Sequence, residues 1–301
     1  MTSPLMEDAG LLPPSRRISL LRLLARDPSA MVALVWIFVL ALVLVANVWF
    51  LQAYSVRVDL KLRNAPPFTL DNGWIYYLGA DSLGRSMIAR LAAAAGPSLG
   101  VAFAAVGFSL VCGAILGLVA GWMSGPVGTL ILRVADMIQG FPTFLLALVV
   151  LYIFGPSVVN LVIVLGITRM PAYVRVARAE VLEIRERLFI DASRVLGASP
   201  WWMVRQHVLP IVAPTLLTIA SVNLAMVMLI ESGLSFIGLG IQPPAASWGL
   251  MVAQGRGYLS NAWWLACFPG LAIMFTTIAF NLLSSWFRMA TDPQQRWRLE
   301  L

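Results

Sequence analysis

The residues that could do chemistry gather in one polar stretch between two strongly apolar runs. It extends from Phe189 to Pro210 and reads FIDASRVLGASPWWMVRQHVLP, with charged side chains, one glycine, two prolines and the only histidine of the chain. A lone histidine, His207, at such a place is more often a structural hydrogen-bonding residue than a pH switch. The residue types of this stretch are therefore suited to binding a surface, either lipid headgroups or a partner protein.

The chain lacks the patterns of the common catalytic sites. An ATP-hydrolysing P-loop needs a lysine after a glycine-rich turn, and the only lysine, Lys61, stands in DLKLR without a glycine beside it. A single histidine excludes the usual zinc hydrolase sites, and no serine of SGLSFIGLG lies in a G-x-S-x-G nucleophile elbow. The sequence predicts a chain that is not an enzyme and holds no cofactor of its own.

The composition indicates an integral membrane protein. Of the 301 residues, 60% are hydrophobic and only 12% are charged, whereas a soluble domain has about 45–50% apolar and about 25% charged residues. The net charge of +7 comes almost entirely from arginines that stand between and beside apolar runs. That distribution favours anchoring at a membrane face over binding of nucleic acid.

Six apolar runs predict six transmembrane helices and an all-α membrane protein. The first run has 21 uncharged residues and would be about 31 Å long as a helix, which matches a hydrocarbon core of about 30 Å. The runs are Ala30–Phe50, Pro97–Trp122, Val127–Phe154, Ser157–Tyr173, Ile211–Ile230 and Ala262–Phe287. The third run is interrupted by Pro142 and by two charges near its start.

These runs divide the chain into an N-terminal segment, a first span, a loop, a core and a tail. The expected divisions are 1–28 (cytoplasmic), 29–51 (first transmembrane helix), 52–96 (extracytoplasmic loop), 97–290 (core domain with five helices) and 291–301 (cytoplasmic tail). Fifteen lysine and arginine residues fall on the side of the N-terminus, Arg169 among them, and six fall on the other side. The positive-inside rule therefore places both termini and the segment 174–209 in the cytoplasm.

The segment 174–209 predicts two helices joined by a turn. No helix breaker appears from Arg175 to Leu196, and apolar residues recur there at helical spacing. Gly197 is typical of a helix end, and Ser199 with Pro200 can cap and begin a second, shorter helix. Pro210 is then expected at the entry to the fifth span.

The apolar stripe of this helix–turn–helix could rest on lipid headgroups or dock a soluble partner. Small residues at Ala192, Ser193 and Gly197 would let another protein approach closely. The composition alone does not decide between the two.

A few residues outside this segment are further candidates. Glu231 ends the expected fifth span, where it could line or gate a pathway or act as a capping residue. Asn223 could contact a solute, although a hydrogen bond to a neighbouring span is the commoner role. Gly113, Gly117 and Gly121 recur every four residues and predict close helix packing. The stretch 232–261 is too broken by glycine and proline to span, and we expect a re-entrant or interfacial loop at the outer mouth.

The stretch D-A-S-x-x-x-G-x₁₁-L-P resembles the EAA motif of ABC importer permeases. Its markers are Asp191, Ala192, Ser193, Gly197, Leu209 and Pro210, with serine in place of the second alanine and His207 in place of an isoleucine. LGADSLGRSMIARL (78–91), RVADMIQGFPTFLLAL (133–148), ESGLSFIGLGIQPPAASWG (231–249) and FPGLAIMFTTIAFNLL (268–283) are similar to the peptide/nickel branch of these permeases, in particular to the C-type subunits of dipeptide and oligopeptide importers. The resemblance covers about residues 16 to 295 and departs around 52–77.

This resemblance implies the type I ABC importer permease fold in the bacterial inner membrane. It implies a second, related permease subunit, two ABC ATPase subunits that bind ATP and Mg²⁺, and an extracytoplasmic solute-binding protein. The six marker residues would then couple the spans to the ATPase. The solute stays open among peptides, nickel chelates, opines and glutathione-like molecules.

Two rival functions belong to other classes. A self-contained, ion-coupled secondary transporter generally needs several intramembrane ionisable groups, and few stand in these runs. A membrane scaffold that transports nothing could use the same amphipathic segment to recruit partners.

Overall fold

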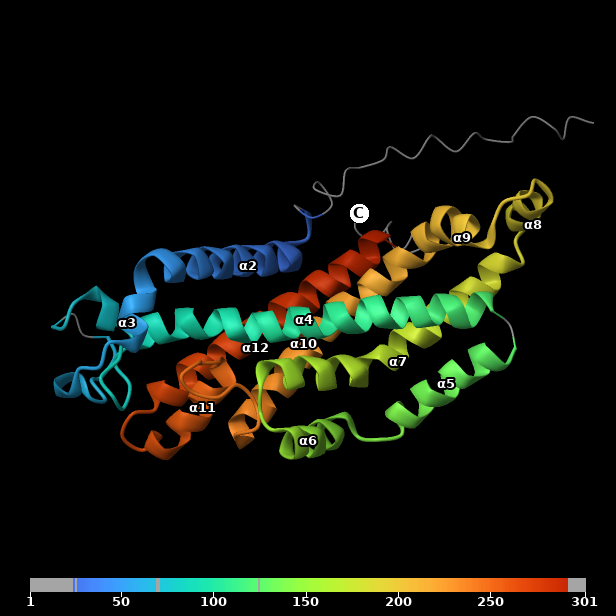
Figure 1. Ribbon diagram of the computed structural model, residues 1–301. Helices are drawn as coiled ribbons and strands as arrows, with labels where there is room; N and C mark the ends of the chain where they lie inside the picture. The colour runs from blue at the N-terminus through green and yellow to red at the C-terminus, as the bar shows by residue number, and fades with distance from the viewer. Residues whose placement is uncertain (1–23, 25, 69–70, 124, 292–301) are drawn as a thin grey trace, which may run out of the picture.

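The computed structural model describes residues 24, 26–68, 71–123 and 125–291, and this part of the chain is built of helices and loops without a strand. Long helices lie side by side in an elongated bundle, and short helices and loops gather at its two opposite ends (Figure 1). The helices are α2 (Pro28–Ala46), α3 (Gln52–Val56), α4 (Met87–Trp122), α5 (Pro126–Gln139), α6 (Thr143–Phe154), α7 (Val158–Arg185), α8 (Leu188–Val195), α9 (Pro200–Met203), α10 (Leu209–Ile237), α11 (Trp248–Gly255) and α12 (Trp264–Thr291).

Five helical segments of the described chain are long and apolar enough to cross a membrane. They are Pro28–Val56, Met87–Trp122, Val158–Arg185, Pro200–Ile237 and Trp264–Ala290. The expected third span is instead the pair α5 and α6, which meet at an angle of 87°. The break lies at Gly140–Pro142, where proline removes a backbone donor and cannot continue a helix.

Helices α4 and α7 run parallel in close contact along the glycines of α4. A Cβ at Gly117 would lie 2.5 Å from the Cβ of Ala177, and the same closeness holds for Gly113 against Tyr173 and for Gly121 against Val181. Only glycine lets two backbones approach this far. The predicted close packing at the four-residue glycine spacing is confirmed.

The parallel course of α4 and α7 shows how α5 and α6 cross the bundle. The contacting residues keep a constant offset of 60 positions, so Val158 at the start of α7 lies level with Ser98 of α4. Between Trp122 and Val158 the chain must return along 24 residues of α4, a distance of about 36 Å. That exceeds a hydrocarbon core of about 30 Å, so the bent pair acts as one broken span and the bundle has six crossings.

Six crossings bring both ends of the described chain to one side. Pro28 at the start of α2 and the last turn of α12 lie toward the end of the bundle that carries α8 and α9 (Figure 1). The two helices contact each other, and the indole Nε1 of Trp36 donates to the Thr276 hydroxyl at 3.1 Å. The part of the tail from residue 292 onward lies outside the described residues.

Several helices extend beyond the predicted spans. The second begins at Met87, ten residues before Pro97, with the Ser86 hydroxyl as its N-cap. The fifth continues from α9 through the π-helical turn Val204–Val208 to Ile237, so Pro210 lies inside it rather than at its entry. Hydropathy marks the part of a helix that can lie in lipid, whereas the helix itself continues into water until its hydrogen-bonding pattern ends. The apolar runs are therefore shorter than the helices.

The fourth span differs most from the prediction. A separate surface helix was expected from Arg175 to Leu196, but α7 continues without a break to Arg185 and the chain turns at Glu186 and Arg187. Arg187 is extended there (φ −80°, ψ 140°) although neither glycine nor proline is present. The first part of the predicted first helix, up to Arg185, is thus the end of the fourth span, and only α8 remains of that helix as a separate element. The predicted second helix, α9, begins the fifth span.

Candidate functional site

The segment that joins α7 to α10, residues 186–208, is a short hairpin of two helices, called here the α8–α9 segment. Gly197 ends α8 with φ at +83°, a conformation that favours glycine. The N–H of Ala198 donates to the carbonyl of Ser193 at 3.0 Å, which closes the helix end. The Ser199 hydroxyl then accepts the N–H of Trp202 at 3.3 Å and caps α9. The predicted turn and restart are therefore present.

The inner side of the α8–α9 segment is fixed to the bundle. Ile190, Met203 and Val208 are buried in the main core. His207 packs edge-on against Trp202 and Phe189, with ring centroids 5.1 Å and 5.7 Å apart, and so joins the two short helices. Directly before the segment, the Arg185 guanidinium donates to the carbonyl of Trp122 at 3.1 Å, which ties the end of α7 to the end of α4.

The outer side of the α8–α9 segment exposes large apolar side chains. Leu188, Val195, Leu196 and Trp201 have 86%, 87%, 87% and 73% of their surface exposed. Beside them a cleft of about 580 Å³ opens, lined by Trp122, Arg185, Glu186, Asp191, Arg194, Ala198, Pro200 and Met203. Apolar residues concentrated on one exposed side indicate an interaction surface.

Four of the six predicted coupling residues lie together on the exposed side of the segment. They are Asp191, Ala192 and Ser193 in α8, and Gly197 just after it. Asp191 forms an ion pair with Arg194 at 3.0 Å, in which both side chains are more than half exposed. The remaining two, Leu209 and Pro210, form the first turn of α10, and both are exposed.

Glu231 lies inside α10 rather than at its end, because the helix continues six residues further to Ile237. Its side chain is completely buried and accepts a hydrogen bond of 2.7 Å from the Ser235 hydroxyl. Ser235 in turn accepts a hydrogen bond of 3.2 Å from the Ser247 hydroxyl in the following loop. A carboxylate held in this way ties the loop 238–247 to α10 in this conformation.

Asn223 is also in α10, at the middle of the bundle. Its amide donates to the hydroxyl of Tyr173 in α7 at 3.1 Å, and both side chains are buried. The structure therefore shows the bond to a neighbouring span that was the commoner of the two predicted roles.

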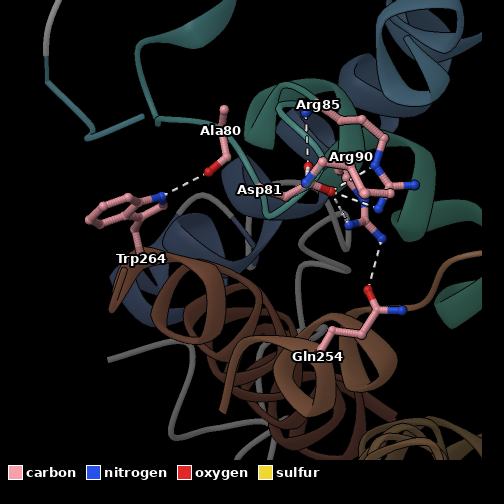
Figure 2. Close-up of polar contacts among 7 residues, drawn as sticks. Ala80, Asp81, Arg85, Arg90, Gln254 and Trp264 are labelled. Carbon is pink, nitrogen blue, oxygen red and sulfur yellow. Dashed lines mark hydrogen bonds and ion pairs between the residues drawn. The ribbon is translucent and has the colours of Figure 1, made fainter. Parts of the chain in front are cut away.

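At the opposite end, the loop before α4 is held by a buried ionic cluster, called here the Asp81 network (Figure 2). The Asp81 carboxylate accepts hydrogen bonds from the backbone N–H of Arg85 at 2.8 Å and from its Nε at 2.7 Å. It also pairs with Arg90 of α4, whose guanidinium reaches Gln254 of α11 at 3.2 Å. Nearby, the indole of Trp264 donates to the carbonyl of Ala80 at 3.2 Å.

The network lowers the pKa of Asp81. Burial alone would raise the pKa of this carboxyl, but the N–H of Arg85 and the positive charges of Arg90 and Arg85 outweigh burial and hold the pKa below its ordinary value. Sequence reasoning did not identify this cluster, although three charges within ten residues at the start of a span, DSLGRSMIAR, were a usable signal.

Known proteins match the chain over most of its length. The family described as "Binding-protein-dependent transport system inner membrane component" matches residues 113–297, which include the α8–α9 segment. The Probable D,D-dipeptide transport system permease protein DdpC of Escherichia coli (strain K12) is 31% identical over 272 residues, 90% of each chain. The Di/tripeptide transport system permease protein DppC of Pseudomonas aeruginosa (strain UCBPP-PA14) is 38% identical over 230 residues, 76% of each chain.

A nickel permease and a solved transporter extend the comparison. The Nickel transport system permease protein NikC of Escherichia coli (strain K12) is 34% identical over 265 residues, 88% of this chain and 94% of the relative. An inward-facing structure of the MetNI methionine ABC transporter superposes with a TM-score of 0.51 at 19% identity and covers 65% of this chain and 94% of that one. The fold is that of a type I ABC importer permease, as the resemblance implied.

The family match, the relatives and the six-crossing bundle agree with the predicted all-α membrane protein of the inner membrane. The chain belongs to the family of inner-membrane components of binding-protein-dependent transport systems.

Proposed function

We propose that this chain is the transmembrane permease subunit of an ATP-driven importer and forms half of a translocation pathway for peptides or a related small solute. A second, homologous permease supplies the other half. Two separate ATPase subunits bind ATP and Mg²⁺ and drive the cycle. An extracytoplasmic solute-binding protein delivers the solute.

The observation that carries this proposal is the construction of the α8–α9 segment. Its inner side is anchored through Ile190 and Met203, while Leu188, Val195 and Leu196 are left in contact with solvent. Exposing such side chains is unfavourable by about 25 cal/mol per Å² unless a partner covers them. The segment thus fits a soluble partner, and the rigid contact between α4 and α7 can carry that partner's motion into the spans.

The orientation follows from the distribution of arginines. With six crossings, both ends of the described part of the chain and the α8–α9 segment share one side of the membrane, and this side holds the larger number of arginines. The positive-inside rule makes that side cytoplasmic, where ATP is available to an ATPase bound at Asp191–Gly197.

The class of solute is supported by the relatives. Two of the similar permeases are named for dipeptide or di/tripeptide transport and one for nickel transport. We place this chain with the peptide importers, since the relative with the highest identity among these three is the di/tripeptide permease.

The test is ATP-dependent uptake by the reconstituted complex with Leu196→Asp in the permease. A charge in the middle of the docking surface should lower ATPase co-purification and uptake at least tenfold, since it would bury an unpaired carboxylate. The matched control is Leu259→Asp, an exposed leucine at the opposite end, which should leave ATPase co-purification unchanged. Uptake driven by an ion gradient in the permease alone would contradict the proposal and favour a secondary transporter.

A further inference from the structure

One partly buried cation lies near the middle of a span. Arg169 is in α7, eleven residues after Val158 and sixteen before Arg185, which places it about 16 Å and about 24 Å from the two helix ends. In the constant register between α4 and α7 it lies level with Ser109 of α4. Arg169 was expected among the cations of the inner side, and the structure instead places it within the span.

Arg169 has no carboxylate partner within the part of the chain that the structure describes. No ion pair or hydrogen bond is present at its guanidinium, and its Nε is buried without an acceptor. Arg175 of the same helix, by contrast, pairs with Asp136 of α5 at 3.2 Å. A charge near the centre of a span costs about 2.5–3.5 kcal/mol or more, and such residues face the interior of the bundle or a water-filled path.

The surroundings of Arg169 are polar at the same depth. Tyr173 follows one turn later, within electrostatic reach of the guanidinium. The hydroxyl of Tyr173 accepts the amide of Asn223 from α10 at 3.1 Å and lies beside the hydroxyl of Ser109 from α4. Three spans thus contribute polar groups around the Tyr173 hydroxyl, one turn from this cation.

The buried carboxylate of α10 does not neutralise this cation. Glu231 is held by Ser235 at 2.7 Å and forms no ion pair with Arg169. Arg178 also has a buried Nε without an acceptor, but it lies only seven residues before the end of α7, in the same turns as Glu180 and Glu183. Arg169 is therefore the cation of α7 that combines mid-membrane depth with the absence of a nearby acid in its own helix.

The geometry points to Arg169 as a binding residue for a carboxylate of the transported solute, at mid-depth in the pathway. A guanidinium matches a carboxylate with two parallel hydrogen bonds, and every unmodified peptide carries one carboxylate at its C-terminus. The buried Tyr173–Asn223 hydrogen bond joins α7 to α10 one turn from this guanidinium and so helps to fix its position. This assignment rests on the proposed function, in which a solute crosses between these spans.

The first experiment compares uptake of alanyl-alanine by reconstituted complexes carrying Arg169→Gln, Arg169→Lys or Arg175→Gln. We expect Arg169→Gln to lower ATP-dependent uptake about tenfold, the effect of losing one charged hydrogen bond. Arg169→Lys should retain uptake between that of Arg169→Gln and the wild type, because it keeps the charge but loses the two parallel hydrogen bonds. Arg175→Gln, which removes a cation that already has an acid, should change uptake less than threefold.

The second experiment measures binding without transport. Phenylglyoxal modifies accessible arginines, and mass spectrometry of the purified complex reports the rate at Arg169. We expect alanyl-alanine to slow modification of Arg169 and alanyl-alanine amide, which lacks the carboxylate, to leave the rate unchanged.

Two results would overturn the assignment. The first is equal protection of Arg169 by the free peptide and the amide together with wild-type uptake in Arg169→Gln. The second is loss of the second permease from the Arg169→Gln complex, which would show that an acid of that subunit pairs with Arg169. If the wild-type complex shows no ATP-dependent uptake while alanyl-alanine still protects Arg169, the proposed importer function fails and the carboxylate site stands.

Discussion

The connecting segments at the two ends of the bundle are stabilised in opposite ways. At one end the loop before α4 is held by the buried Asp81 network, in which the Asp81 and Arg90 side chains are almost completely enclosed. At the other end, the α8–α9 segment has an ion pair between Asp191 and Arg194 that is more than half exposed, and its largest apolar side chains contact solvent. The loop before α4 is thus fixed by ion pairs within the chain, and the α8–α9 segment presents a surface that another molecule can cover.

This difference indicates where the energy of each region comes from. A buried ion pair with full hydrogen bonding gives little net stability, but removal of one partner leaves an uncompensated charge and is costly. An exposed pair contributes about 0–1 kcal/mol. The Asp81 network therefore fixes one geometry, whereas the α8–α9 segment keeps its shape through Gly197, Ser199 and its buried residues and leaves its outer side available.

The largest effect is expected from Arg90→Ala. Removal of this guanidinium leaves the carboxylate of Asp81 buried beside fewer partners and frees Gln254, which should lower the free energy of unfolding by about 3–5 kcal/mol. Thermal unfolding of the detergent-solubilised chain measures this. A loss below about 1 kcal/mol would show that the two ends do not differ in this way.

A pair of glycine substitutions comes next. Gly197 and Gly155 have φ at +83° and +84°, and a Cβ at either position would meet open space. Replacement by alanine should therefore cost about 1–2 kcal/mol at both sites through backbone strain alone. Only Gly197→Ala should also weaken ATPase co-purification, because Gly155 lies in the turn between α6 and α7. Equal loss of the ATPase in both variants would remove Gly197 from the docking surface.

How far the sequence predicted the molecule can be judged from the same regions. Gly197, Ser199 and Pro200 predicted the turn correctly, since capping is local and depends on a few residue types. The break at Arg187 could not be predicted, because no residue type there opposes a helix and tertiary contacts of Ile190 with the core decide it.

The positions of the polar groups within the fold were also not predictable from the sequence alone. Glu231 and Arg169 were placed near span ends by hydropathy, yet both lie inside helices that continue beyond the apolar runs. The pairing of Asp81 with Arg90 needed a fold, since two charges nine positions apart do not share a helix face unless a turn brings them together.

As the pH falls, the loop before α4 should lose stability earlier than the α8–α9 segment does. Because the folded pKa of Asp81 is lowered, its contribution to stability is fully present above its unfolded pKa of about 3.9 and is lost as the pH falls through the folded value. Hydrogen exchange of residues 71–86 should therefore accelerate only below about pH 4. Acceleration that begins near pH 6 would contradict the assignment to this carboxylate.

The smallest effect is expected from Arg194→Ala. Its ion pair with Asp191 is exposed, so the free energy of unfolding should change by less than about 1 kcal/mol. Denaturant titration beside the Arg90→Ala chain gives the direct contrast. A loss as large as that of Arg90→Ala would show that the α8–α9 segment depends on its surface charges.

The most direct test of the central claim is cross-linking from the α8–α9 segment to an ATPase subunit. Leu196→Cys would be made in a chain whose Cys112 and Cys267, both free thiols, are replaced by alanine, and labelled with a benzophenone maleimide in membranes that contain the whole complex. The account predicts a light-dependent cross-link between position 196 and an ATPase subunit, and none from Leu259→Cys at the opposite end. Absence of a cross-link from position 196, or an equal one from position 259, would contradict it.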